Sequence, residues 1–189
     1  MNKEFSLALV GASGVVGTKI IKLLEKRLFP VGKFIPLGNS TVGSSIEFNN
    51  KKYLVESLET FDPQTAQIII FSAGSTVAEK YARDFVAAGS FVVDLSSNFR
   101  YQDDVPLIIP EINGDIIESL SKPSLIANPN CSTAQLLMVL KPIHDNAKIK
   151  FLNIATYQAV SGTGKAALEE LHNQTYFKDS KNELSLIHI

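Results

Sequence analysis

The sequence predicts an α/β fold built on a doubly wound parallel sheet, followed by the start of a second domain. Three observations lead to this prediction. Short apolar segments alternate with amphipathic segments over roughly the first hundred residues. One apolar segment, QIIIFSA at residues 67–73, is continuous enough for a central strand covered on both faces. A glycine-rich turn, GASGVVG, stands between the first apolar segment and the first amphipathic one.

Each expected strand of the first domain is a short apolar run bounded by turn-forming residues. The expected strands are residues 5–10, 33–37, 67–73 and 91–95, and residues 125–130 lead into Cys131. Helices are expected at residues 15–28 and 76–88. In the first helix the spacing predicts one buried face, made of Val16, Ile20, Leu23, Leu24 and Leu28. Residues 96–113 have no clean periodicity and contain two prolines, which indicates a long structured loop.

Beyond this loop the pattern resumes around Cys131. A helix is expected at residues 132–140, a longer strand at 148–160 and a further helix at 163–176, with Leu168 and Leu171 on its apolar side. We place the boundary between the two domains near Cys131, which gives domains of residues 1–130 and 131–189.

Composition excludes several classes of function. The 189 residues are 45% hydrophobic and 20% charged with a net charge of −1, and no run of like charges indicates a nucleic-acid or membrane partner. One cysteine excludes an intramolecular disulfide, and the amino terminus lacks the pattern of a signal peptide, so a cytoplasmic location is expected. His144, His172 and His188 lack metal-ligand spacing, so no metal site is expected.

The glycine turn predicts a dinucleotide site. Gly11, Gly14 and Gly17 lie between a strand and a helix, where a tight turn lets backbone N–H groups approach a pyrophosphate. A turn that serves packing alone is the alternative. The second strand ends without the acidic residue that holds the ribose of NAD, which favours NADP, although no arginine is present there and NAD stays possible.

Cys131 is the candidate nucleophile. It stands at the start of an expected helix, whose N–H groups favour a thiolate and could stabilise an oxyanion. The alternative is a small buried core residue. Arg100, in the long loop, could bind a phosphate or carboxylate, or simply lie on the surface. Gln158 could hold a polar group of a substrate.

Taken together, the motifs resemble the aspartate-semialdehyde dehydrogenase family over nearly the whole chain. The matching segments, in order, are GASGVVG (11–17), FSAGSTVAEKYA (71–82), VVDLSSNFR (92–100), DVPLIIPEIN (104–113), NPNCST (128–133) and TYQAVSGTGKAA (156–167). The related N-acetyl-gamma-glutamyl-phosphate reductases share the architecture but differ before the cysteine.

The resemblance implies a Rossmann-like NAD(P)-binding domain and an incomplete α+β catalytic and dimerisation domain. The implied reaction belongs to the aspartate pathway of lysine, diaminopimelate, methionine and threonine biosynthesis. It interconverts aspartate 4-semialdehyde and 4-aspartyl phosphate with NADP and phosphate, in a homodimer or homotetramer. The resemblance also implies roles for individual residues. Cys131 forms a thioester, Gln158 positions the substrate, and Arg100 with Asn130 binds substrate and phosphate. The implied cofactor residues are Gly11, Ser13, Gly14, Val15, Val16, Gly17, Ser40, Thr41, Gly74, Ser161 and Gly162.

Two features of the carboxyl end affect this interpretation. No histidine matches the family's general base, so the 189-residue chain is expected to be inactive by itself. Residues 184–189, LSLIHI, resemble the translation of a sequencing adapter, so they are expected to be non-native. A non-catalytic dinucleotide-binding or oligomerisation module is the remaining alternative.

Overall fold

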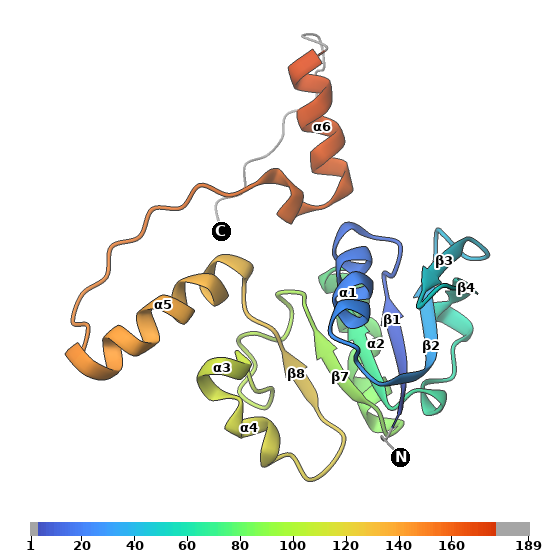
Figure 1. The fold of residues 1–189 in the computed structure, drawn as a ribbon, viewed down its shortest axis with the longest axis horizontal. Helices are drawn as coiled ribbons and strands as arrows, with labels where there is room; N and C mark the ends of the chain where they lie inside the picture. Colours follow the sequence, from blue (N-terminus) through green and yellow to red (C-terminus); the bar gives the residue numbers. More distant parts are fainter. Residues whose placement is uncertain (1–3, 177–189) are drawn as a thin grey trace. The chain divides into compact units, whose positions relative to one another are not determined.

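The computed structural model describes residues 4–176, and the chain divides into two compact units, Met1–Leu152 and Asn153–Ile189. A six-stranded sheet is the centre of the first unit (Figure 1). Its strands are β1 (Phe5–Val10), β2 (Val31–Gly38), β5 (Glu56–Ser57), β6 (Ile68–Phe71), β7 (Phe91–Asp94) and β8 (Leu125–Ala127). They pair in the order β5-β2-β1-β6-β7-β8, and every pairing is parallel.

The strand order confirms the doubly wound sheet. From β1 the chain first moves outward to β2 and β5, and then returns to add β6, β7 and β8 on the other side. Leu7 of β1 accordingly pairs with Phe34 of β2 and with Ile68 of β6. The direction reverses between β1 and β6, and in such sheets ligands bind beyond the carboxyl ends of the strands at this reversal.

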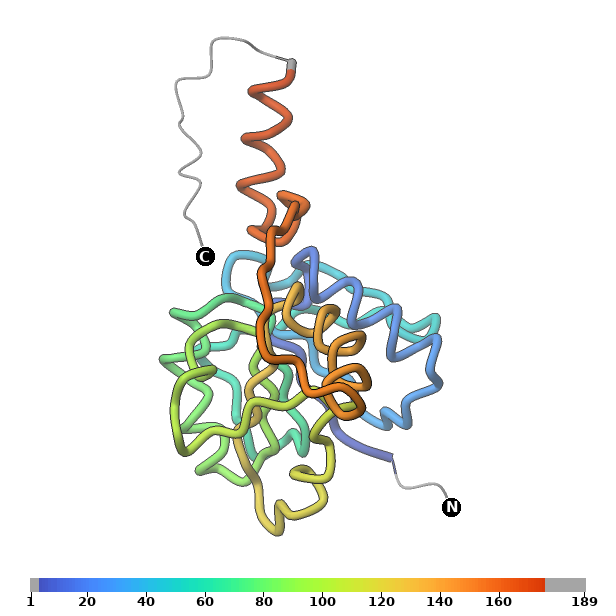
Figure 2. Tube along the Cα trace, turned by 90° about the vertical axis from the view of Figure 1, so that its left-hand side faces the viewer, coloured from blue at the N-terminus to red at the C-terminus, as the bar shows by residue number. Residues whose placement is uncertain are grey.

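Helices cover both faces of the sheet. On one face α1 (Val15–Lys26) packs through Ile21 against a core that contains Leu7 and Leu9. On the other face α2 (Ser75–Ala87) packs through Ala78, Ala82 and Phe85, in a core that also takes Ala8 and Val10 of β1. In Figure 2 the blue segment of α1 lies to the right and green segments lie to the left. The alternation along β1 thus supplies both cores.

The buried face of α1 differs from the one that the spacing predicts. Gly17 and Ile21 are buried, and Ile20 and Leu24 pack partly against the same core. Val16, Leu23 and Leu28 are exposed, so their predicted burial is wrong. The cause is Gly17: without a side chain it lies against the glycine turn, which rotates the face around Gly17 and Ile21 toward the sheet. The helix ends at Lys26, two residues before the expected end.

A hairpin that the sequence interpretation did not include lies beside α1. It consists of β3 (Ser45–Phe48) and β4 (Lys51–Leu54). Its two turn residues, Asn49 and Asn50, have φ of 49° and 60°, which asparagine tolerates and a two-residue hairpin turn requires. Phe48 is buried and its ring lies 4.7 Å from that of Phe34, so the hairpin closes one core.

The long loop after β7 forms as predicted, apart from a single helical turn at its end, α3 (Pro110–Asn113). A second short helix, α4 (Asp115–Glu118), precedes β8. Then α5 (Cys131–Ala147) begins one residue before the expected helix and continues past Pro142 to Ala147.

The strand expected at residues 148–160 is wrong for this structure: no described strand pairs with this segment, and a β-strand needs a neighbour for its backbone groups. Phe151, Leu152, Ile154 and Tyr157 are exposed along it. The second unit contains a 3₁₀ turn (Val160–Thr163) and α6 (Lys165–Tyr176), which confirms the expected helix. Ala167 of α6 is buried, whereas Leu168 and Leu171 are exposed, contrary to the predicted apolar side. Residues 184–189, His188 included, lie outside the described residues.

Candidate dinucleotide and thiol site

Two positions of the glycine turn at the end of β1, Gly11 and Gly17, accept only glycine. Gly11 has a φ of 79°, and a Cβ there would lie 2.9 Å from the carbonyl oxygen of Ser72, in the segment after β6. At Gly17 a Cβ would lie 2.3 Å from the carbonyl oxygen of Gly11. The turn is therefore locked between β6 and the first turn of α1, at the reversal point of the sheet.

Two helix starts at this reversal carry no side-chain cap. Gly14 caps α1 without a side chain, and the first turn of α1 contains no acidic residue. Ser13 and Gly14 are exposed, and so is Val16, while Val15 is half-buried. Gly74, with a φ of 88° and open space where a Cβ would be, stands in the same position for α2. Unpaired helix N–H groups in reach of solvent fit the pyrophosphate of a dinucleotide.

The loop after β2 lies against the glycine turn. Thr41 Oγ1 and Ser13 Oγ are 3.0 Å apart and share a hydrogen bond. Ser40 is exposed, and the segment from Gly38 to Thr41 has no carboxylate. Hydroxyl groups without a nearby negative charge are compatible with either a free ribose hydroxyl or a ribose phosphate.

Further hydroxyl groups, which the sequence interpretation missed, link neighbouring strand ends. Ser72 Oγ donates to the carbonyl oxygen of Val10 at 2.8 Å. Ser75 Oγ, in the first turn of α2, is 3.1 Å from Ser97 Oγ in the loop after β7. Serines in loops are common, and only the strand order identifies these as neighbours.

Arg100 belongs to the loop after β7 and is half-buried, not a free surface residue. Its Nε donates to the carbonyl oxygen of Asn128 at 3.0 Å, and its Nη2 donates to that of Leu95 at 3.2 Å. Because both acceptors are main-chain atoms at the ends of β7 and β8, the guanidinium is held in place. Its Nη1 has no hydrogen-bond partner within residues 4–176 and stays available to an anion.

A second arginine fastens the same loop to α2. Arg83 forms a two-fold hydrogen-bonded ion pair with Asp104, at 2.8 and 3.1 Å, and also donates to Gln102. The hydrogen bond from Arg83 lowers the pKa of the Asp104 carboxyl. The guanidinium lies 5.6 Å from the ring centre of Phe99, which is buried. The residues on either side of Arg100 are thereby anchored to α2.

Cys131 is the first residue of α5 and its thiol is exposed, which excludes the alternative of a buried core residue in the described structure. Asn130 caps the helix: its Oδ1 accepts from Ser132 N at 2.9 Å and from Ser132 Oγ at 2.8 Å. An exposed thiol at a fixed helix start is accessible to a carbonyl compound.

Three further site candidates lie in the second unit. Gln158 is exposed, and its Nε2 donates to Thr156 Oγ1 at 3.3 Å. Ser161 and Gly162 belong to the 3₁₀ turn before α6.

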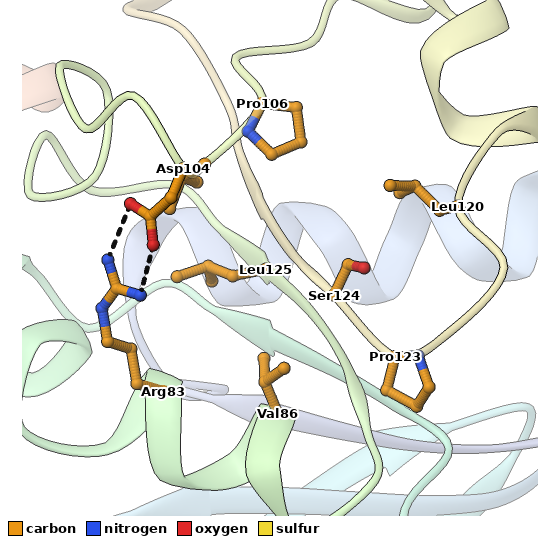
Figure 3. A pocket seen from close by; sticks show the side chains of 9 residues that line it. Arg83, Val86, Asp104, Pro106, Leu120, Pro123, Ser124 and Leu125 are labelled. Atoms are coloured by element: carbon orange, nitrogen blue, oxygen red, sulfur yellow. Dashed lines mark hydrogen bonds and ion pairs between the residues drawn. The ribbon is translucent and has the colours of Figure 1, made fainter.

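A cavity of about 260 Å³ in the first unit (Figure 3) is lined by no residue of the glycine turn. Arg83 and Val86, in the carboxyl-terminal half of α2, line it together with Leu125 at the start of β8. The Arg83–Asp104 pair closes one side of it. Residues 4–176 contain no cluster of His, Cys, Asp or Glu that could hold a metal ion, and none of their helices is long and apolar enough to cross a membrane.

The sheet order, the glycine turn and the open helix starts define a Rossmann-like dinucleotide-binding domain. Residues 6–120 match the family model of the semialdehyde dehydrogenase NAD binding domain, and residues 140–187 match that of the semialdehyde dehydrogenase dimerisation domain. The chain therefore belongs to the semialdehyde dehydrogenase family, and carries its NAD-binding domain with part of its dimerisation domain.

Relatives of known name agree with this assignment. The chain is 47% identical over 175 residues to an aspartate-semialdehyde dehydrogenase of Shewanella sp. (strain DB6705), covering 92% of this chain and 52% of the relative. It is similar to the crystal structure of aspartate semialdehyde dehydrogenase II from Vibrio cholerae complexed with ASA, with a TM-score of 0.88 and 41% identity over 92% of this chain and 52% of that one. An NADP-bound aspartate semialdehyde dehydrogenase from Candida albicans matches with a TM-score of 0.63 and 25% identity, over 77% and 48% of the two chains. The chain thus spans about half the length of the relatives it matches.

Proposed function

We propose that this chain is the cofactor-binding part of an aspartate-semialdehyde dehydrogenase that interconverts aspartate 4-semialdehyde and 4-aspartyl phosphate. The observation that carries the proposal is the exposed Cys131 thiol at the capped start of α5, in a chain of this family. A dinucleotide-binding or oligomerisation module without catalysis needs no such thiol. The relatives named above favour the aspartate enzyme over an N-acetyl-gamma-glutamyl-phosphate reductase.

In the proposed reaction the Cys131 thiolate adds to the aldehyde carbon, and the new alkoxide takes up negative charge near the start of α5. Bound NADP supplies the acceptor for the hydride that leaves this carbon. The resulting thioester is attacked by phosphate, which releases 4-aspartyl phosphate and restores the thiolate. Arg100 and Asn130 bind substrate and phosphate, and Gln158 positions the substrate.

The dinucleotide is proposed to lie across the reversal of the sheet. Gly11, Gly14 and Gly17 shape the turn, while Ser13, Val15, Val16 and Gly74 approach the phosphates at the two helix starts. Ser40 and Thr41 face the adenosine side, and Ser161 and Gly162 contribute from the second unit. We propose NADP as the cofactor, because the loop after β2 has no carboxylate and the Candida albicans relative is an NADP complex. The active form is proposed to be a homodimer or homotetramer, in line with the matched dimerisation domain.

The test uses the full-length gene product that carries this sequence. It should reduce NADP with aspartate 4-semialdehyde only when phosphate is present. Cys131→Ala should lower kcat by about a thousandfold or more, because the proposed thioester forms on this thiol. The Kd for NADP should stay within about twofold of the wild-type value. Phosphate-dependent turnover that survives in Cys131→Ala would refute the nucleophile.

A further inference from the structure

Asp94 is a buried acidic residue that has no role in the proposed dinucleotide site or in the reaction of the thiol. It ends β7, its exposed fraction is 0%, and it is the one acidic residue buried within residues 4–176. Acidic side chains are rarely buried completely without a partner of their own. Strand pairing in the sheet therefore does not by itself account for a buried carboxyl group at this position.

Its carboxylate holds the turn that follows β7. Oδ1 accepts from the backbone N–H of Ser96 at 3.1 Å, and Oδ2 accepts from Ser96 Oγ at 2.6 Å. Ser96 Oγ in turn accepts from the backbone N–H of Asn98 at 3.1 Å. The carboxylate thus sets the conformation of the chain directly before Arg100.

The main chain of Asp94 contacts the segment that follows β8. Its carbonyl oxygen accepts from Asn128 N at 2.8 Å, and the carbonyl oxygen of Asn128 accepts from Arg100 Nε. Asn128 lies two residues before the helix cap Asn130. One residue therefore connects the turn that carries Arg100 with the segment that leads to Cys131.

Burial disfavours the ionised form of the Asp94 carboxyl group. Burial raises the pKa of Asp94, while the hydrogen bonds from Ser96 and the charge of Arg100 act in the opposite direction. The folded protein therefore binds this proton more tightly than the unfolded chain. The associated stability is complete below the ordinary carboxyl pKa and declines as pH rises through the folded value. Burial of this carboxyl group thus opposes its ionised form, which the hydrogen bonds from Ser96 and the charge of Arg100 favour.

We infer that Asp94 is a positioning residue, which aims the unpaired Nη1 of Arg100 at an anionic group of the substrate and keeps it in register with the Cys131 segment. This inference rests on the proposed function, in which Arg100 binds phosphate. Asp94 acts through Ser96 and the turn, and does not itself touch the substrate.

Ser90 provides a matched control. It stands just before the opposite end of β7, its exposed fraction is also 0%, and its hydroxyl donates to the carbonyl oxygens of Ala66 at 2.7 Å and Pro63 at 3.0 Å. Ser90→Ala removes buried hydrogen bonds far along the same strand from Arg100. A purely structural role of Asp94 would make Asp94→Asn behave like Ser90→Ala.

The experiment measures KM for inorganic phosphate, kcat and Tm in the full-length gene product. Asp94→Asn should raise the phosphate KM about tenfold with a change of less than about threefold in kcat, and Arg100→Lys should raise it by at least as much. Ser96→Ala, which keeps the carboxylate and one of its bonds, should raise it by about threefold. Ser90→Ala should lower Tm and leave the phosphate KM within about twofold.

The outcomes separate the two proposals. A wild-type enzyme without phosphate-dependent turnover overturns the proposed function. With an active wild type, a phosphate KM that is unchanged in Arg100→Lys, or that moves no further in Asp94→Asn and Ser96→Ala than in Ser90→Ala, overturns the positioning role alone. Should Asp94→Asn fail to fold, Ser96→Ala decides.

Discussion

Helices α1 and α5 both begin at the carboxyl edge of the sheet, yet their first turns differ. The start of α1 is capped by Gly14, which has no side chain to satisfy the N–H groups. The start of α5 is capped by Asn130, whose Oδ1 accepts a hydrogen bond from the N–H of Ser132. An open start can receive an anionic ligand, whereas a capped start is rigid before any ligand arrives. The first suits binding, and the second suits holding a reacting thiol.

The largest effect is expected when α1 receives a cap like that of α5. In Gly14→Asp the carboxylate can accept the N–H groups that face the pyrophosphate, and it repels the phosphates. The backbone angles of Gly14, φ −73° and ψ 169°, allow any residue. The Kd for NADP, measured by fluorescence titration of the full-length protein, should rise about 100-fold. Gly14→Ala is the control, because it meets the same 3.2 Å contact with the Gly11 carbonyl oxygen without a charge or a cap.

A smaller effect is expected when the cap of α5 is removed. Asn130→Ala should lower the free energy of unfolding by about 1 kcal/mol, because Ser132 N loses its acceptor. Chemical denaturation checks this value. The Kd for NADP should stay unchanged, and a rise as large as that in Gly14→Asp would contradict the division of roles between the two helix starts.

The smallest effect is expected at the far end of α5. Lys141 Nζ donates to Asp145 Oδ2 at 2.6 Å, and this hydrogen bond lowers the pKa of the Asp145 carboxyl. The pair therefore stabilises the fold above the ordinary carboxyl pKa, and this contribution is lost as pH falls through the folded value. Asp145→Asn should lower Tm slightly at neutral pH, and the difference should vanish in acid.

The alkylation rate of Cys131 is the second quantity to measure in Asp145→Asn. It should match that of the wild type, because both members of the ion pair are exposed and distant along the helix from its first turn. A changed alkylation rate would mean that the whole helix, and not its cap, controls the thiol.

Much of the fold was predictable because two local patterns are strong. The continuous apolar run at residues 67–73 contains the central strand β6, and the glycine turn marks the end of β1. The β3–β4 hairpin was missed, since its signal is only the Asn49–Asn50 pair between two very short strands. The expected strand at 148–160 failed for a different reason: an apolar pattern predicts a strand but does not supply its neighbour.

The candidate site was less predictable than the fold. Cys131 and Arg100 stand out as residue types, but the carbonyl oxygens that hold Arg100 belong to Leu95 and Asn128, and no pattern of side chains reveals main-chain acceptors. In the sequence Asp94 looks like an ordinary polar residue at the end of a strand, and only the structure shows that its side chain is completely buried. Gln158 belongs to the second unit.

The central place of β1 also has a kinetic consequence. β1 is made before the other strands of the sheet, but one of its two neighbours, β6, is about 60 residues further along the chain. During synthesis one edge of β1 therefore stays unpaired until β6 is made, and its apolar residues can associate with other chains. Slow translation before β6 should increase aggregation of this protein, and a chaperone that shields short apolar strands should suppress it.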